Sequence, residues 1–382
     1  MKEMLYGMTL IKLKNYLNEL LFYNIMENIT VDLLNNIKDF VFFKPKTEQE
    51  LQEAVNLWCE NKEEALSIYC HISNWNTILI TNMDSLFQEA YDFNDNINNW
   101  NVANVISMDR MFNGASNFNQ PLEKWDVSKV NIMSNMFRGA TLFDQCINSW
   151  NVSSVTEMYG MFYEASNFNQ PLEKWDVSKV DIMSNMFREA TSFDQCINSW
   201  NVSSVKDMNG MFENASNFNQ PLNNWIVSNV TDMERLFCAT KLFNQELNMW
   251  DVSSVTNMES MFDGAEKFNK PLNSWDVSSV TNMKTMFNDT SFNQPLNSWD
   301  VSKVIDMNGL FFNTHEFNQP LDNWKLKSLK KMKGMFALSN KFNQCLNMWD
   351  VSSVEDKNFI FQNAKSFNKS NATWCDFNQL FL

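Results

Sequence analysis

The stretch that decides the fold is residues 117–136, which reads NFNQPLEKWDVSKVNIMSNM. Its tryptophan, Trp125, recurs every 25 residues along the chain, with a single 24-residue step before Trp299. The members of this series are Trp75, Trp100, Trp125, Trp150, Trp175, Trp200, Trp225, Trp250, Trp275, Trp299, Trp324, Trp349 and Trp374. A strict period of this length is typical of repeat proteins, in which each unit packs mainly against its neighbours. The 382 residues are therefore expected to form one elongated domain.

The first half of each repeat has the pattern of a short strand. Trp125 and Val127 alternate with polar residues at Lys124, Asp126 and Ser128. In a strand, such neighbours point to opposite sides. The buried side would then carry tryptophan and valine, and the exposed side would carry the polar residues.

The second half has the pattern of a short helix. Four apolar residues fall at i, i+3, i+4 and i+7, the spacing of one helix face, namely Met133, Met136, Phe137 and Ala140. Asn131 precedes them and suits an N-cap. The residue missing from the 24-residue repeat is expected to shorten this helix and to leave the register at Trp299 unchanged.

Strand and helix alternate once per repeat, which predicts an α/β solenoid like that of leucine-rich repeats. Each 25-residue repeat would supply one short parallel strand and one short helix, and consecutive strands would form one continuous parallel sheet. Because helices are about 10 Å across and paired strands about 4.8 Å apart, the strand side would be the inside of a curve. Twelve coils at that spacing would be roughly 60 Å long on the strand side.

Helical patterns replace the repeat before Ile72. Thr47 and Glu50 form a capping-box pattern at a helix start. An apolar stripe at helical spacing follows, made of Leu51, Ala54, Val55 and Trp58. A second short helix is expected at about residues 62–69, and two further helices are expected within residues 1–43.

These patterns divide the chain into three parts. We expect an N-terminal helical segment at residues 1–46, capping helices at 47–71 and a repeat solenoid of about twelve 25-residue repeats at 72–382. The first coil of a stack exposes an apolar end that a helix can cover. Capping is therefore the expected role of these helices, and an independent recognition domain in residues 1–43 is the alternative.

The repeat motif also resembles a known family. Leu122, Trp125 and Val127 match the L-x-x-L-x-L signature of leucine-rich repeats, and the full motif F-N-Q-x-L-x-x-W-D-V-S-S-V-T-N-M-x-x-M-F is similar to that of the BspA-like surface-protein repeat family, the mycoplasma type of unknown function. The resemblance covers about residues 72–374, and the lead-in from Thr47 is similar to that of members from large DNA viruses. Where leucine-rich repeats begin an inward asparagine ladder this chain has valine, so Asn119 and its equivalents are expected to form the ladder instead.

Composition bounds the partners. The formal net charge is −15 and the isoelectric point is near 4.7, which argues against nucleic-acid binding, because that would need a basic face. A basic or neutral protein partner fits better. The hydrophobic fraction of 44% and the aromatic fraction of 14% are those of a chain that folds.

Cysteine usage bears on location. Cys146 and Cys196 lie two repeats apart, roughly 10 Å at strand spacing, which is too far for a disulfide. Reduced thiols, with no signal peptide, lipidation cysteine or membrane-spanning stretch in the sequence, favour an intracellular or virion-associated protein. The alternative is a surface or secreted adhesin.

Catalytic patterns are missing from the sequence. It contains just two histidines, His71 and His315, no closely spaced glycines and no Cys-x-x-Cys pair. General acid–base catalysis, phosphate loops and zinc motifs all depend on such residues. We therefore expect no enzyme activity, no cofactor and no metal.

The candidate partner-binding residues lie on the exposed side of the predicted strands. Asp251, Asp276 and Asp300 follow three successive tryptophans and would form an acidic strip that a cation or a basic partner could neutralise. The alternative is that each side chain caps the turn after it. Ile226 replaces the acidic residue in one repeat, with Met249 diagonally beside it, and the two form a candidate apolar hot spot or a tolerant position.

One basic cluster completes the candidate residues. It contains Lys325, Lys327, Lys330, Lys331 and Lys333. Lys325 falls between Asp300 and Asp350 in the exposed column, so it either compensates its neighbours or contacts a partner. The sequence as a whole predicts a non-enzymatic repeat scaffold that binds a protein through its strand face; a surface or secreted adhesin is the alternative, and an enzyme is the least favoured class.

Overall fold

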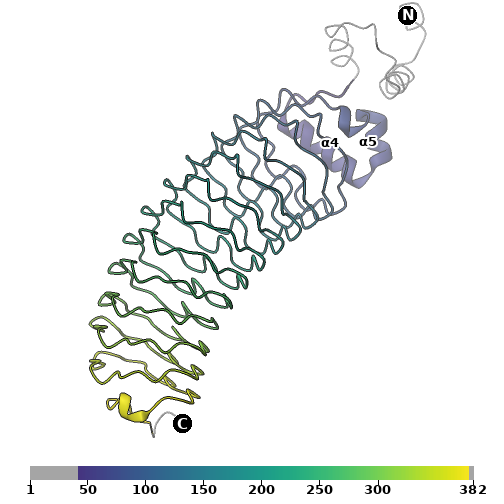
Figure 1. The fold of residues 1–382 in the computed structure, drawn as a ribbon. Coiled ribbons are helices and arrows are strands. Elements are labelled where there is room, and N and C mark those ends of the chain that lie inside the picture. The colour runs from purple at the N-terminus through teal and green to yellow at the C-terminus, as the bar shows by residue number, and fades with distance from the viewer. Residues whose placement is uncertain (1–41, 378–382) are drawn as a thin grey trace, which may run out of the picture.

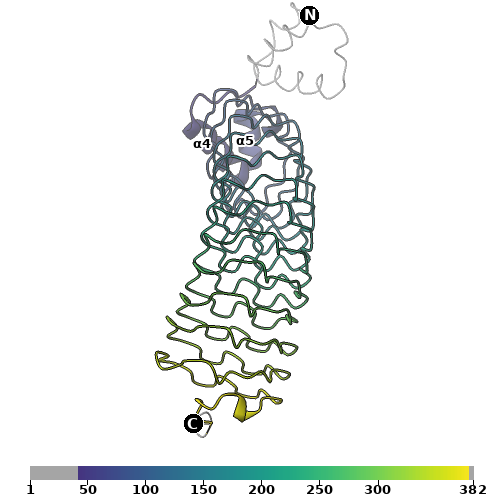
Figure 2. The ribbon, with the colours of Figure 1, turned by 60° about the vertical axis from the view of Figure 1, so that its left-hand side comes forward.

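A computed structural model describes residues 42–377, which form a curved stack of coils with two helices at its N-terminal end (Figure 1). Each repeat of 25 residues makes one coil. Figure 2, turned by 60°, shows the same stack with the helices at one end and the C-terminal coil at the other. Two helices were expected within residues 1–43; residues 1–41 lie outside the described residues, and residues 42–46 are not helical.

The N-terminal end of the stack carries helices α4 (Glu48–Glu60) and α5 (Lys62–Tyr69). Thr47 caps α4, because its side chain accepts a hydrogen bond from the Glu50 N–H at 3.1 Å. The apolar stripe of α4 is buried, and the Trp58 ring packs edge-on against Trp75 of the first coil at 5.9 Å. Two 3₁₀ turns flank the coils, η1 (Ile72–Asn74) and η2 (Lys369–Asn371).

The segment expected to be a helix in each repeat forms consecutive tight turns instead. Asn135 and Gly139 have φ of 53° and 67°, and a left-handed residue every fourth position is incompatible with a right-handed α-helix. The N–H of Met136 bonds to the carbonyl of Met133, three residues back. The helix prediction for this segment, with Asn131 as its N-cap, is therefore wrong.

The remaining N–H groups of this segment bond to the next coil. Met133, Asn135, Phe137 and Gly139 donate to the carbonyls of Glu157, Tyr159, Met161 and Tyr163 at 2.7–3.0 Å. The turns thus bury the apolar positions that a helix face would bury. Their hydrogen bonds, however, run along the stack rather than along one element.

The continuous parallel sheet is also absent from the described residues. Consecutive coils are joined by isolated parallel bridges, such as Ile132 with Glu157, and the series runs from Asn82 to Asp356. No bridge falls at Trp125 or Val127, where a strand was expected. The predicted α/β solenoid, with one strand and one helix per repeat, is therefore wrong as a fold class.

The burial pattern of the Trp125 segment is nevertheless as predicted. Trp125 and Val127 are buried, whereas Lys124 and Asp126 are exposed. Turn hydrogen bonds replace a strand ladder here: Trp125 N–H donates to the Leu122 carbonyl and Val130 N–H donates to the Val127 carbonyl. Alternating exposure therefore arises from successive turns rather than from a pleated strand.

Stacked aromatic rings fill the interior. Trp125 and Trp150 stack at 6.3 Å, whereas Phe137 and Phe162 stack at 5.8 Å. From Trp100 onward each indole N–H of the series donates across coils, as when Trp150 Nε1 donates to the Leu122 carbonyl at 3.0 Å. The distance between stacked rings of consecutive coils is thus larger at the tryptophans than at these phenylalanines. This indicates that the tryptophan side lies toward the outside of the curve. The prediction that it forms the inside is wrong, because the inter-coil backbone hydrogen bonds lie elsewhere.

A polar ladder runs along the coils where it was predicted. Asn119 Oδ1 accepts from Asp144 N–H at 3.0 Å and from Gln145 Nε2 at 2.8 Å in the next coil. Asp144 Oδ1 repeats the pattern with Asn169 N–H and Gln170 Nε2. The ladder at Asn119 and its equivalents is confirmed, and it satisfies backbone groups that the turns leave free.

The short repeat keeps its register. Trp299 is buried and stacks on Trp275 at 6.3 Å with the rings 2° from parallel. The missing residue is absorbed in the turn before Phe292, whose N–H donates to Thr290 Oγ1 at 3.3 Å. The register prediction is confirmed, although no helix is present to be shortened.

Gly210→Ala should destabilise the protein more than Gly264→Ala. Both glycines have positive φ, so each substitution pays the left-handed penalty of about 1–2 kcal/mol. A Cβ at position 210 would also lie 2.6 Å from Asn185 Oδ1, whereas at position 264 the nearest atom is 3.5 Å away. We expect an additional loss of about 1 kcal/mol for Gly210→Ala, measured by chemical denaturation. Asn185 has φ of 57°, so Asn185→Ala carries a cost of its own; in that background the additional loss from Gly210→Ala should disappear. Equal losses for the two glycines in the wild-type background would contradict the close contact.

Candidate functional site

The tryptophan face is the exposed surface formed by the residues immediately before and after each tryptophan of the series. In most coils these positions hold Asn, Asp, Ser or Lys. They are exposed because the tryptophan between them points inward, as at Trp250. The candidate residues Ile226, Met249 and Lys325 all lie on this face.

Each Asx residue that directly follows a tryptophan from Trp100 to Trp349 closes a local turn. Asp126 Oδ1 accepts a hydrogen bond from the Ser128 N–H, two residues on, at 3.1 Å. The same bond is made by Asn101, Asn151, Asp176, Asn201, Asp251, Asp276, Asp300 and Asp350. The capping role predicted as the alternative for this column is confirmed.

These turns also fix the charge of the face. The side chain and backbone N–H of Ser253 hydrogen-bond the carboxylate of Asp251 and hold its pKa below the usual range. The corresponding hydrogen bonds from Ser302 also lower the pKa of the Asp300 carboxyl. Asp276 makes the same turn bond at 3.0 Å. The three aspartates therefore form a row of oriented, exposed carboxylates on consecutive coils.

The side-chain hydrogen bond of this turn is lost at Ile226, because isoleucine has no oxygen to accept it. Its side chain is 59% exposed, and Met249 in the next coil is 84% exposed. Trp225 and Trp250, which they flank, stack at 6.3 Å. The predicted apolar spot is thus present as two neighbouring exposed side chains at the end of the aspartate row.

The same side-chain hydrogen bond is lost a second time at Lys325, four coils further along the stack. Here a groove of about 450 Å³ is lined by Trp324, Lys325, Leu326, Lys327, Met348 and Asp350. Met348 is 75% exposed. Lys325 and Lys327 therefore border a hollow on the tryptophan face, with an exposed methionine in the next coil as at the first spot.

The predicted basic cluster is divided by the fold. Lys330 pairs with Glu355 at 3.3 Å and Lys331 pairs with Asp306 at 3.6 Å. The ammonium group of Lys333 lies 5.7 Å from the Phe359 ring centroid. Of the five, Lys325 lies on the tryptophan face and Lys327 lines the groove beside it. Sequence reasoning overlooked Met348, although methionine precedes a tryptophan of the series in just two repeats.

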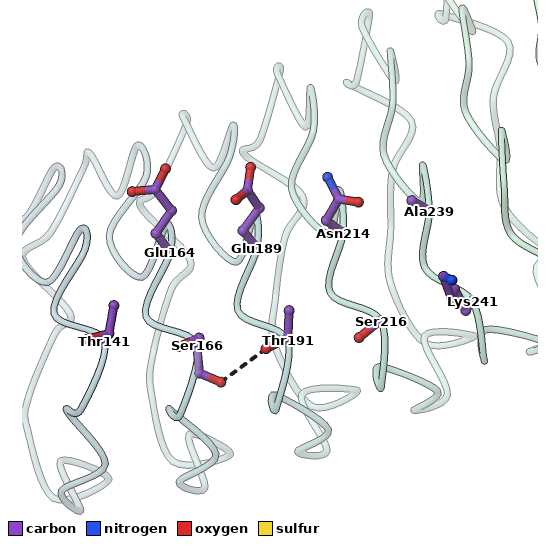
Figure 3. A pocket seen from close by; sticks show the side chains of 9 residues that line it. All are labelled: Thr141, Glu164, Ser166, Glu189, Thr191, Asn214, Ser216, Ala239 and Lys241. Carbon is purple, nitrogen blue, oxygen red and sulfur yellow. Dashed lines mark hydrogen bonds between the residues drawn. The ribbon is translucent and has the colours of Figure 1, made fainter.

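A second surface groove, of about 640 Å³, runs across several coils on another part of the stack. Figure 3 shows its two rows: one holds Glu164, Glu189 and Asn214, and the other holds hydroxyl side chains such as Ser166 and Thr191. Thr191 Oγ1 donates to the Ser166 carbonyl at 3.3 Å. Thr141 Oγ1 makes the corresponding bond to the Ser116 carbonyl, so the threonine hydroxyls of this row join one coil to the next.

A column of stacked charged residues lies on the turn segments. The guanidinium groups of Arg138 and Arg188 lie 4.5 Å and 5.2 Å from the Tyr163 ring centroid. Arg188 also pairs with Glu213 at 3.1 Å. Burial, opposed by Arg188, raises the pKa of Glu213. Nothing in the sequence spacing of these residues marks them, since each belongs to a variable position of the repeat.

The histidines have structural contacts. His71 Nδ1 lies 2.8 Å from Ser73 Oγ, and its ring packs against Trp58. His315 Nδ1 lies 2.9 Å from the Leu338 carbonyl. Over residues 42–377 no three His, Cys, Asp or Glu side chains are grouped to hold a metal ion. The helices described there include none that is long and apolar enough to cross a membrane.

The stacked, nearly identical coils define a tandem-repeat protein. The chain matches the family model described as Mycoplasma protein of unknown function, DUF285, over residues 58–172, 143–245, 217–308 and 288–380. These overlapping matches span all of the described coils and well over half of the sequence, so the chain belongs to this repeat family. No curated protein matches the chain.

Glu213→Gln should change how stability depends on pH. A carboxyl whose folded pKa is raised contributes stability that is fully present below its unfolded pKa and is lost as pH rises through the folded value. The unfolding free energy of the wild type should therefore fall relative to Glu213→Gln as pH rises from about 4.5, the unperturbed glutamate value. Denaturation curves across this range measure the difference. Glu355→Gln, at an exposed ion pair, is the control; parallel profiles for wild type and Glu213→Gln would contradict the burial argument.

Proposed function

We propose that this chain is a non-enzymatic repeat scaffold that binds a protein partner on its tryptophan face. The observation that carries the proposal is the pair Ile226 and Met249, 59% and 84% exposed, at positions where other coils hold polar residues. Large exposed apolar side chains on an otherwise polar surface are typical of contact hot spots. The four tandem matches to the family model are compatible with a repeat scaffold.

The electrostatics of the face favour a partner with basic residues beside an apolar one. The chain has a formal charge of −15, and the aspartates after Ile226 are exposed and hold their charge in a fixed orientation. Exposed charges of this kind mainly set association rate and salt dependence, whereas the buried apolar anchor dominates affinity. The apolar pair would thus supply affinity, and the aspartates on the following coils would set the association rate and the salt dependence.

We also propose that the chain has no catalytic role. His71 contacts the hydroxyl of Ser73 and also accepts a hydrogen bond from its N–H, so it serves as the cap of a 3₁₀ turn, and His315 Nδ1 contacts the Leu338 carbonyl. Burial raises the pKa of the Cys238 thiol to about 12, which keeps it protonated and unreactive. The closer relationship to BspA-like proteins, and to members from large DNA viruses, stays a prediction from the repeat motif and the lead-in.

Ile226→Asp should abolish partner capture without weakening the fold. The aspartate would restore the turn bond to the Ser228 N–H that other coils make, so the free energy of unfolding should stay equal or rise by about 0.5–1 kcal/mol. The carboxylate of the new aspartate would have no partner in the apolar contact with the bound protein, so binding should lose most of its affinity. Quantitative pull-down from the native source, with circular dichroism on the same samples, measures both effects.

Ile106→Asp is the matched control. Ile106 is 49% exposed but lies six residues after Trp100, away from the tryptophan face, where its N–H and carbonyl bond to the coils on either side. Partners that bind the tryptophan face should be lost with Ile226→Asp and retained with Ile106→Asp. A folded Ile226→Asp protein that keeps every partner of the wild type would rule the tryptophan face out as the binding surface.

A further inference from the structure

The spacing of the coils on the tryptophan face matches the period of an extended peptide. Trp225 and Trp250 lie 6.3 Å apart, and so do Trp275 and Trp299. In an extended chain every second side chain points the same way, and these side chains recur at about 6.6 Å. The turn segments have a tighter ring spacing of 5.8 Å at Phe137 and Phe162, which departs further from that period. A peptide lying along the stack axis would therefore present one side chain per coil to the tryptophan face.

The tryptophan face has two apolar spots at matching positions. The first is Ile226 with Met249, and the second is the groove that Met348 lines together with Lys325 and Lys327. Each spot combines a coil that has lost its Asx turn with an exposed methionine in the following coil. They are four coils apart, or roughly 25 Å at the tryptophan spacing, which an extended chain covers in about eight residues.

The charges between the two spots have a fixed order. Asp251, Asp276 and Asp300 lie on the three coils between Ile226 and Lys325, and each is held by its turn bond. Side chains that are already ordered lose little entropy when a partner binds them. A side chain that enters the first spot would be followed, two and four residues later, by side chains lying between successive aspartates. Lys325, in the coil after Asp300, disfavours a basic residue six residues after the first side chain.

We propose that the tryptophan face binds one extended segment of a partner protein, with apolar residues eight positions apart and basic residues two and four positions after the first of them. This rests on the proposed function and specifies the partner: an unfolded, basic segment read by alternate side chains. Ile226 and Met249 hold one apolar residue, the groove at Met348 holds the other, and the aspartates pair with the basic residues between them.

The test uses fluorescent nine-residue peptides and the full-length protein. The matched peptide has leucine at positions one and nine, lysine at three and five, and serine elsewhere. An isomer moves the second leucine to position seven, and a third peptide replaces that leucine by serine. The matched peptide should bind about tenfold more tightly than either of the others, as measured by fluorescence anisotropy.

Two variants of the protein test the individual contacts. Met348→Ser should reduce the affinity of the matched peptide to that of the single-leucine peptide and leave the latter unchanged. Asp276→Asn keeps the turn, since asparagine makes the same bond at Asn101, Asn151 and Asn201, and it removes the charge shared by both lysines. It should weaken binding and flatten the salt dependence. The matched control is Asp126→Asn, which makes the same turn bond four coils before Ile226 and should preserve the salt dependence.

Equal affinity for the matched peptide and its isomer would overturn this inference. The proposed function would survive that result if Ile226→Asp still abolished partner capture. Failure of all three peptides to bind at about 1 mM would likewise overturn the extended-segment arrangement. Retention of partners by the folded Ile226→Asp protein would overturn the proposed function as well.

Discussion

The structure depends on hydrogen bonds that run from each coil to the next. They are possible because two residues per coil, such as Asn135 and Gly139, have a left-handed backbone. This conformation turns alternate N–H groups out of the local turn and toward the neighbouring carbonyls, at 2.7–3.0 Å. A continuous helix would bond these groups internally and leave coils to associate through side chains alone. The aromatic stacks and the Asn119 ladder then fill the space that this backbone arrangement fixes.

The sequence predicted burial better than it predicted secondary structure. Met133, Met136, Phe137 and Ala140 are all buried, as their spacing indicates. That spacing does not separate a helix from two consecutive turns, because both return the chain to the same side after three or four residues. The left-handed positions are occupied by Arg, Ser, Glu and Asn as well as Gly, so composition gave no signal for them. What decides the matter is hydrogen bonding between coils, which a single repeat cannot reveal.

The candidate site was predictable to the extent that it departs from the repeat. Ile226 and Met249 stood out because the consensus is strict, and both are exposed. Met348 could have been found by the same comparison, since methionine precedes a tryptophan of the series only there and at Met249. The separation of Lys325 from Lys330 could not have been predicted in this way, because it depends on which turn of the coil each lysine occupies. The aspartate column has an established structural role in its turns, and any recognition role is added to it.

The direction of the inter-coil hydrogen bonds has a mechanical consequence. Because these bonds lie along the stack axis, a force pulling the two ends apart loads them in tension, and the interfaces between coils are loaded in series. The weakest interface would separate first, and each detached coil would release roughly 80 Å of extended chain before the next interface is loaded. Such a molecule yields in steps and absorbs work over a long extension instead of breaking at once. Its length in repeats would then set how far it can be drawn out, independently of what its tryptophan face binds.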